Sequence, residues 1–365
     1  MPEIERRTTH PYHMYDAIQA QPACAAEALQ TNTSQLDGAS DLLRQQQHLI
    51  LCGIGTSFHA ALVGEHLVRL LAGDQPFAQA VHSFDFVLYP TLIRPGTGVL
   101  VVSHRGTKNY SLQALFHANQ QKAPTVTITG KESAEGIRKA RIVMITTDQE
   151  ISSAHTKSYT ATLSLLADLA VRMGRRSGRD VAAAEAQVAA ISTLMQRALQ
   201  TEAQVREIAR ALIGKEFIVF VGGGPNAATA YEVALKMKEA NYTPCEGFQV
   251  EQFLHGPLAG LSDRMAVWVI APPGPSYERC LDIVGAANAI GATTIALMQE
   301  GDQTLARKAT HAIGLPALAE PLTPLVYVIP LQLFCYHLAL AKGANPDTFH
   351  LDDPRHQEAR KHYSL

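Results

Sequence analysis

The chain repeats itself at long range. The segments HLILCGIGTSFHAA (residues 48–61) and FIVFVGGGPNAATA (217–230) are both apolar runs that end in a glycine-rich turn and continue into small residues. Further apolar runs recur in pairs at about the same separation, near 168 residues: 99–104 with 266–271, and 125–129 with 293–297. The sequence therefore predicts two copies of one fold.

Within each copy, apolar runs alternate with helical segments such as residues 59–73. This alternation is typical of βαβ units and of a parallel sheet covered on both faces, so we expect a doubly wound α/β fold, twice. We expect a helical lead-in over residues 1–45, a first domain over 46–175, connecting helices over 176–212, a second domain over 213–342 and a C-terminal tail over 343–365.

Composition narrows the class of partner. The 365 residues are 47% hydrophobic and 18% charged, enough apolar residues for large cores. Lys and Arg number 31 against 33 Asp and Glu, so net charge favours neither nucleic acid nor an anionic membrane as a partner.

Targeting and redox signals are sparse. The N-terminus has no apolar stretch after its charges, so we expect a cytoplasmic protein. Five cysteines without CxxC spacing indicate reduced thiols and no metal knuckle. The apolar run 321–341 approaches membrane length, but Pro324, Pro330, Gln332 and His337 interrupt it, so a buried helix or a subunit interface is expected.

In each copy, one glycine turn follows the first predicted strand. Parallel sheets bind ligands at the carboxyl ends of their strands, where these turns are expected to lie. Gly55, Thr56 and Ser57 offer backbone N–H groups and hydroxyls to an anion or a sugar hydroxyl, or they only cap their own helix. The turn 222–227 fits the dinucleotide pattern GxGxxA, and Glu246 lies further along, which keeps a nicotinamide enzyme open.

Two more clusters contain side chains of the kinds that bind ligands or transfer protons. Ser103, His104, Arg105 and Lys108 follow the apolar run 98–102 and offer a hydroxyl, an imidazole and two cations to a ligand. The segment 234–260 brings Glu239 and His255, with other carboxylates, close together in sequence. Carboxylate and imidazole can move protons, although a solvated helix face and a structural turn explain the same residues.

Several blocks together are similar to the tandem SIS (sugar isomerase) domains, with flavodoxin-like folds, that form the isomerase half of glucosamine-6-phosphate synthase and its stand-alone relatives. The blocks are HPYHMYDAIQAQP, CGIGTSFHAA, EISSAHTKSYT, YEVALKMKEANYTPCEGFQVEQFLHGPL and PLVYVIPLQLFCYHLALAKG. The glutaminase part of the full synthase is not expected, because no nucleophilic cysteine follows Met1.

The resemblance implies a phosphate pocket in the first copy. The family turn reads Ser-Gln-Ser-Gly-Glu-Thr, so Ser103 is expected to line the pocket. Here His104 replaces the Gln, while Arg105 and Lys108 replace hydroxyl donors with cations, whose charge-assisted bonds are worth about 1.5–3 kcal/mol each. Further expected contacts with the sugar are Gly55, Thr56, Ser57, Ser153, Ala154 and His155.

The resemblance also implies three catalytic residues. Glu239 matches the glutamate that moves a proton between C1 and C2, and His255 matches the ring-opening histidine, which in the family acts across a dimer interface. Lys361 is the candidate for the Schiff-base lysine, but it stands two residues farther from Pro354-Arg355 than the family spacing. A mobile tail lysine without a role is the alternative.

The expected function is therefore aldose–ketose isomerisation or deamination of a phosphorylated sugar by a homodimer, without a metal or redox cofactor. A sugar-phosphate sensor without catalysis and a fructosyl-amine phosphate deglycase stay open as alternatives.

Overall fold

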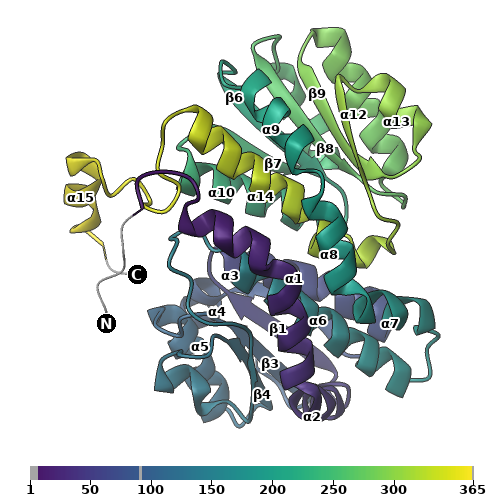
Figure 1. Cartoon of the computed structure of the whole chain (residues 1–365). Coiled ribbons are helices and arrows are strands. Elements are labelled where there is room, and N and C mark those ends of the chain that lie inside the picture. The colour runs from purple at the N-terminus through teal and green to yellow at the C-terminus, as the bar shows by residue number, and fades with distance from the viewer. Residues whose placement is uncertain (1–6, 90–92, 364–365) are drawn as a thin grey trace. The chain divides into compact units, whose positions relative to one another are not determined.

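Figure 1 shows the computed structural model of the protein, which describes residues 7–89 and 93–363. These residues form two compact units, each with a hydrophobic core of its own. The N-terminal unit holds the described residues of 20–150 and 157–192, and the C-terminal unit holds residues 7–19, 151–156 and 193–363.

The described residues of the N-terminal unit form one sheet of five parallel strands in the order β2-β1-β3-β4-β5. The strands are β1 (His48–Gly53), β2 (Phe77–His82), β3 (Thr97–Val102), β4 (Thr125–Thr129) and β5 (Ile142–Ile145). This order is that of flavodoxin-like folds, and it confirms the predicted doubly wound sheet.

Helices cover both faces of this sheet. The helices α2 (Thr33–Leu43), α3 (Thr56–Leu67) and α6 (Lys157–Arg176) pack together, while α4 (Ser83–Leu88) packs with α5 (Asn109–Gln120). Alternate residues of β1 face the two layers: Leu51 lies against α3 and Leu166 of α6, whereas Ile50 and Cys52 join the core of α5. Burial on both faces explains why the strands are continuous apolar runs.

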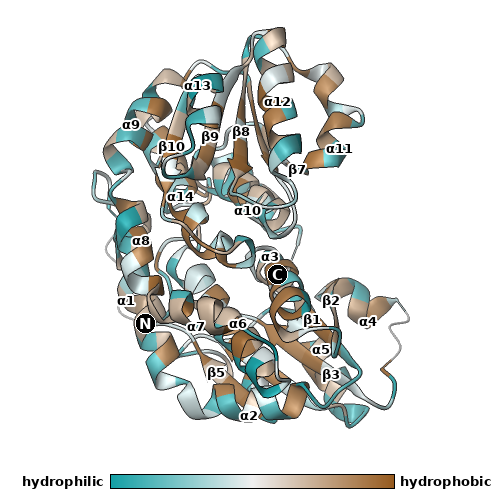
Figure 2. Cartoon of the chain, turned by 90° about the vertical axis from the view of Figure 1, so that its right-hand side faces the viewer, coloured by the Kyte–Doolittle hydropathy of each residue, from teal (hydrophilic) through white to brown (hydrophobic). Residues whose placement is uncertain are grey.

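The C-terminal unit repeats this topology. Its described strands pair in parallel in the order β10-β9-β8-β6-β7, the same succession as in the first sheet. The strands are β6 (Phe217–Gly222), β7 (Cys245–Gln249), β8 (Met265–Ala271), β9 (Thr293–Gln299) and β10 (His311–Leu315). The predicted repeat is therefore confirmed, and Figure 2 shows β8 and β1 as hydrophobic strands.

Helices of the C-terminal unit carry the residues discussed below. They are α9 (Glu202–Ala211), α10 (Pro225–Ala240), α11 (Val250–Leu254), α12 (Tyr277–Ile290), α13 (Gln303–Lys308), α14 (Pro324–Ala341) and α15 (Pro354–Arg360). Both α9 and α10 pack against α14.

The predicted helical lead-in and connecting segment are also helical in the structure. The lead-in contains α1 (His13–Thr31) and α2, and the connection contains α7 (Ala182–Ala189), α8 (Ile191–Leu199) and α9. Residues 1–6 of the predicted lead-in and residues 364–365 of the predicted tail lie outside the described residues.

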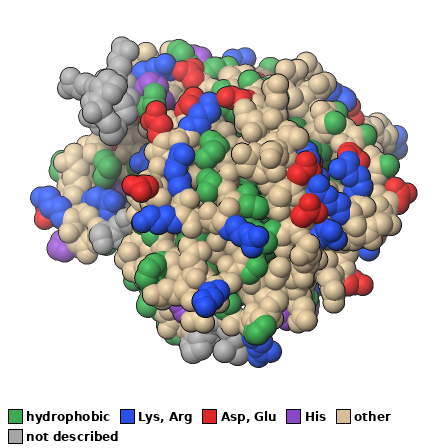
Figure 3. Space-filling view, turned by 90° about the horizontal axis from the view of Figure 1, so that it is seen from below, with side chains coloured by type: hydrophobic (Ala, Val, Ile, Leu, Met, Phe, Trp, Pro, Cys, Tyr) green, Lys and Arg blue, Asp and Glu red, His purple; other side chains and the backbone are tan. Residues whose placement is uncertain are grey.

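Among the described residues, α14 is the one helix long and apolar enough to cross a membrane, yet 89% of its most apolar window is buried inside the protein. A core helix has the same composition, and the predicted buried helix is confirmed. On the face shown in Figure 3, Lys and Arg are interspersed with Asp and Glu, so no field of a single sign covers that face.

Candidate active site

The turn after β3 is shaped by its backbone. The N–H of Ser103 donates to the carbonyl of Ile128 (3.0 Å), and the hydroxyl of Thr129 donates to the carbonyl of Ser103 (2.7 Å). Gly106 has a φ of 68°, and a Cβ there would lie 2.5 Å from the side chain of Ile137. A glycine is therefore required for the chain to turn from β3 into α5.

His104 is buried in this turn. The hydroxyl of Thr146 donates to the carbonyl of Thr129, so it accepts from Nδ1 of His104, at 3.2 Å. This leaves Nε2 as the acceptor nitrogen of a neutral ring. Burial lowers the pKa of His104, and the nearby carboxylate of Glu150 opposes that shift.

The two cations of the turn differ in exposure. Arg105 is exposed and reaches the carbonyl of Glu150 through Nη2 at 3.4 Å, a long contact. Lys108 is half-buried and caps the N-terminus of α5 with extended backbone. Buried Ser103 and exposed Arg105 thus present a hydroxyl and a guanidinium from neighbouring positions of one turn.

The glycine turn after β1 adjoins this turn. β1 and β3 are neighbours in the sheet, and their following helices, α3 and α5, belong to opposite layers. Such a reversal is where open α/β sheets bind ligands. Gly55, with a φ of 56°, caps α3, and half-buried Thr56 and Ser57 begin the helix. The structure therefore gathers both predicted substrate-binding turns at one sheet edge.

The carboxylate of Glu150 is a feature of the same unit that the sequence analysis did not single out. Glu150 is buried and accepts from the backbone N–H of Ser158 (2.9 Å) and from its hydroxyl. This bond joins the end of the segment after β5 to the first turn of α6.

The predicted contacts Ser153, Ala154 and His155 belong to the C-terminal unit. The backbone N–H of Ser153 donates to the carbonyl of Asp347 (3.3 Å), and Ala154 is buried. Ser153 and His155 are half-buried. The segment is thereby tied to the chain that follows α14.

Glu239 is part of a charged cluster inside α10. Lys236, with a side chain 1% exposed, donates from Nζ to Oε2 of Glu239 and lies 3.6 Å from Oε1 of Glu232, which is fully buried. The Glu239 side chain is 13% exposed. One lysine therefore joins a carboxylate inside the protein to a carboxylate at its edge.

The sequence analysis allowed a solvated helix face as an explanation of Glu239, and it singled out neither Lys236 nor Glu232. The signal was present as the spacing of residues 232, 236 and 239, which places all three on one side of a helix. Packing against α14 turns that side of α10 inward.

The other two predicted catalytic residues lie on other elements. His255 follows α11, has a side chain 77% exposed and places Nε2 3.4 Å from Oε2 of Glu251. Gly256 follows with a φ of 140°, which fixes the turn. Lys361 follows α15, is exposed and pairs with Glu358 at 2.7 Å. Of the three predicted catalytic residues, Glu239 is the one whose side chain pairs with a buried charged group, the ammonium of Lys236.

The second glycine turn packs against other segments of its unit, since a Cβ on Gly223 would lie 2.2 Å from the Cβ of Ser276. A Cβ on Gly274 would lie 2.6 Å from the carboxyl carbon of Glu320, which also lies beside Gly224 at the start of α10. Burial raises the pKa of Glu320, and a hydrogen bond with Ser276 opposes that shift. Glu246 stands near the start of β7, away from the carboxyl edge of the sheet. These placements argue against the nicotinamide enzyme.

Comparison with known families identifies both repeats. The model of the SIS domain family matches residues 42–172 and 211–342. These ranges contain all the described strands of the two sheets.

Curated relatives are named glutamine–fructose-6-phosphate aminotransferase [isomerizing]. The relative from Thermococcus kodakarensis is 31% identical over 350 residues, which are 94% of this chain and 58% of that protein. The relative from Pyrococcus horikoshii is 31% identical over 347 residues, 94% of this chain and 57% of that one. The chain thus spans less than two thirds of the length of these relatives.

Solved structures share the fold. The C-terminal domain of glucosamine-fructose-6-phosphate aminotransferase from Francisella tularensis matches with a TM-score of 0.85 and 22% identity, over 94% of this chain and 99% of that one. Tagatose-6-phosphate ketose/aldose isomerase from Escherichia coli matches with a TM-score of 0.77 and 20% identity, over 94% and 96%. Glucosamine-6-phosphate deaminase from Thermotoga maritima matches with a TM-score of 0.73 and 18% identity, over 92% and 97%.

Proposed function

This chain belongs to the SIS domain family, with one SIS domain in each repeat, and from that premise we propose that it is an enzyme acting on a phosphorylated sugar. The reaction is aldose–ketose interconversion, or loss of the amine from a phosphorylated amino sugar, of the glucosamine 6-phosphate and fructose 6-phosphate type. The names of the relatives and of the structural neighbours support this class of substrate.

The observation that carries the proposal is the cluster of Glu232, Lys236 and Glu239. Placing charges inside a protein costs free energy, and apolar side chains of similar volume often give equal or greater stability. The cluster is therefore best explained by chemistry. Lys236 fixes the position of the Glu239 carboxylate, which remains partly exposed and can meet a substrate.

Glu239 is the proposed base. It removes the proton from C2 of the open-chain sugar, the electrons of that C–H bond form the double bond of an enediol or enamine, and the carbonyl oxygen takes up a proton. Return of a proton to C1, with loss of the hydroxyl proton at C2, gives the ketose; from the amino sugar the same return gives the C2 imine, which water hydrolyses to the ketose and ammonia. Orientation of the base by Lys236 serves both proton transfers, because the carboxylate must face two adjacent carbons in turn.

The remaining roles follow the resemblance of the sequence. The turn with Ser103 and Arg105, together with Thr56 and Ser57, binds the phosphate through hydroxyls, backbone N–H groups and one guanidinium. His255 assists ring opening. Lys361 condenses with the ketose carbonyl, which releases water and forms an imine. The imine activates the neighbouring carbon.

Solvent-exchange NMR tests this function. The protein is incubated in D2O with fructose 6-phosphate, glucosamine 6-phosphate and fructosyl-amine phosphates, and deuterium at C1 and C2 is followed together with release of ammonia or amine. We expect exchange with the wild type and a loss of at least about a hundredfold in Glu239→Gln, which keeps the shape but loses the base.

Glu246→Gln is the matched control, because Glu246 is an exposed glutamate of the same unit on β7. Equal exchange in Glu239→Gln and the wild type would remove Glu239 from the mechanism. Binding of the sugar phosphates without exchange by the wild type would favour the sensor alternative.

A further inference from the structure

The chain that follows α14 is fastened to the end of α10. Lys342 donates from Nζ to the carbonyl of Asn241 (2.9 Å), and the hydroxyl of Tyr242 donates to the carbonyl of Asn345 (3.2 Å). The backbone N–H of His350 donates to the same Tyr242 oxygen at 3.0 Å. Residues 342–350 are thus held at one place by three contacts.

His350 is held in an uncommon conformation. Its φ is 60°, in the left-handed region that most side chains avoid. Its ring lies parallel to that of Tyr242, with centroids 3.7 Å apart and 6° between the planes. The ring of His356 lies 3.9 Å from that of His350, so His350 is placed between an aromatic ring and a second imidazole.

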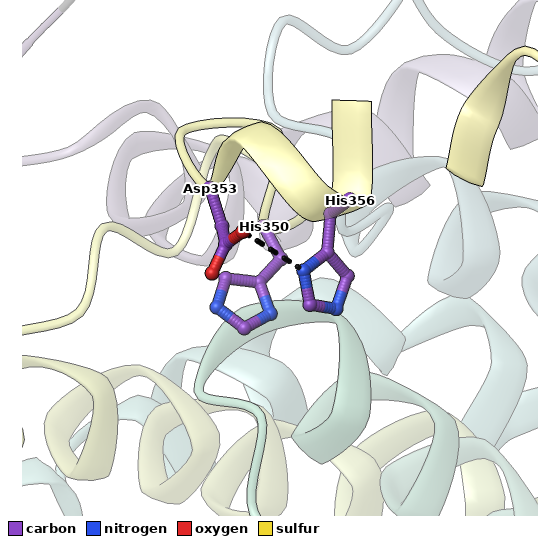
Figure 4. Close-up of side chains that lie close together, drawn as sticks. All are labelled: His350, Asp353 and His356. Carbon is purple, nitrogen blue, oxygen red and sulfur yellow. Dashed lines mark ion pairs between the residues drawn. The ribbon is translucent and has the colours of Figure 1, made fainter. Parts of the chain in front are cut away.

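A carboxylate completes this group. Figure 4 shows His350, Asp353 and His356 projecting from the start of α15 and the loop before it. One ligand atom from each residue lies within 4.8 Å of the others, and Nδ1 of His356 is 3.8 Å from Oδ1 of Asp353. In a tetrahedral site with bonds of about 2.0–2.2 Å, ligand atoms are roughly 3.4 Å apart. Binding an ion requires the rings of His350 and His356, whose centroids are 3.9 Å apart, to turn so that one nitrogen of each points to the same position.

The charge of the group suits a divalent cation. Asp353 accepts from the backbone N–H of Arg355 (2.7 Å) and from its guanidinium (2.7 Å). These contacts orient the carboxylate. The Arg355 side chain is 87% exposed, so it can share Asp353 with a metal or move into solvent.

We propose that His350, Asp353 and His356 bind a divalent first-row transition metal of the zinc class. Two imidazole nitrogens and one carboxylate oxygen are a ligand set that such ions prefer over Mg²⁺ or Ca²⁺. Water completes the coordination on the exposed side, where His356 lies. The bound ion braces α15 against Tyr242, and the proposal does not depend on the reaction assigned above.

Metal titration of the full, untagged chain tests this site. After treatment with EDTA, Zn²⁺ is titrated by calorimetry and Co²⁺ by its visible absorption. We expect one saturable site in the wild type and a loss of affinity of at least about tenfold in His350→Gln, in His356→Gln and in Asp353→Asn, since each removes a ligand or its charge. Asn keeps the helix cap.

His362→Gln is the matched control, because His362 is an exposed histidine in the same segment outside the group. It should bind Zn²⁺ as the wild type does. Zn²⁺ should also slow tryptic cleavage after Arg355, Arg360 and Lys361 in the wild type but not in His356→Gln. Absence of saturable binding by the wild type, or equal affinity in the His350→Gln/His356→Gln double variant, overturns the proposal.

Discussion

Arg105 differs from its neighbours in the turn after β3 because its side chain is exposed, whereas Ser103 and His104 are buried. Buried His104 bonds Thr146 and keeps a neutral ring, so it shapes the turn more than it supplies charge. Arg105 is the exposed one of the two cations of this turn, and its guanidinium can add charge to an anion site, whereas Lys108 is half-buried. This distinction leads to a prediction for substrate binding.

Arg105→Ser should weaken binding of the phosphate without altering the chemistry at C1 and C2. We expect the KM to rise by roughly tenfold, with a small change in kcat, because a charge-assisted bond common to ground and transition states is lost. Steady-state kinetics and the inhibition constant of inorganic phosphate measure this effect.

Arg141→Ser serves as the control, since Arg141 is an exposed arginine of the same unit away from the turn. Equal phosphate inhibition constants in the wild type and Arg105→Ser would mean that Arg105 has no part in anion binding. In that case Ser103 and the backbone N–H groups carry the phosphate.

Helix α10 carries the proposed catalytic base, Glu239, beside buried charged groups that are costly for stability. One side of it places Glu232, Lys236 and Glu239 in the interior, where each charge depends on the others. α14, which is almost wholly apolar, packs against it and excludes water. The pairing of these two helices makes the charges interdependent, so their removal one at a time should be costly.

Lys236→Met should destabilise the C-terminal unit by about 3–5 kcal/mol, because it removes the buried ammonium group that pairs with the carboxylates of Glu232 and Glu239. The double variant Glu232→Gln/Lys236→Met should recover a large part of that loss. Trp268, the one tryptophan of the sequence, lies buried on β8 of this unit, so its fluorescence during urea unfolding reports the change. A single variant as stable as the wild type would contradict the interdependence.

The contact between α9 and α14 predicts a dependence on pH. His337 of α14 is buried and bonds Glu202 of α9 at 3.1 Å. Burial lowers the pKa of His337; Glu202 opposes the shift, and Arg206 and His10 add to it. The unfolded chain, in which histidine titrates near pH 6.5, therefore binds the proton first as pH falls.

The stability of the C-terminal unit should consequently be retained above about pH 6.5 and fall progressively as the pH drops below that value. His337→Gln should flatten this fall, because it removes the titrating ring. Urea unfolding followed by Trp268 at several pH values measures the slope. Identical slopes in the wild type and the variant would show that His337 does not contribute.

At the scale of the whole molecule, the exposure of His255 bears on assembly. Its side chain is 77% exposed, and its contact with Glu251 lies at the surface. An exposed residue can act on a second copy of the chain, as the resemblance of the sequence implies. We predict a homodimer in which His255 serves the site of the partner subunit.

Mixing two inactive variants tests this arrangement. If His255 acts in the partner's site, dimers formed from Glu239→Gln and His255→Ala chains contain one intact site, and random mixing should restore roughly a quarter of the wild-type rate. The dimer itself is measured by sedimentation. A monomer with full activity, or no recovery on mixing under conditions in which the chains exchange, would contradict the prediction.

The sequence by itself determined the repeated βαβ architecture. Strand and helix periods are local properties, and burial of a parallel sheet on both faces leaves continuous apolar runs that can be read directly, as in β1 and β8. Gly55 likewise marks a turn, and its positive φ in the structure explains why a glycine stands there. Glu239 was found through its block of neighbours, and its role in catalysis stays a prediction.

Only the tertiary structure decided which polar side chains are buried and which are brought together. Helical spacing places Glu232, Lys236 and Glu239 on one side of α10, but packing by α14, distant in sequence, makes that side interior. The group of His350, Asp353 and His356 likewise depends on Tyr242, which holds His350 in a left-handed conformation from a distant part of the chain. Such long-range contacts leave no local period in the sequence, because burial and convergence depend on what packs against a segment as well as on the segment itself.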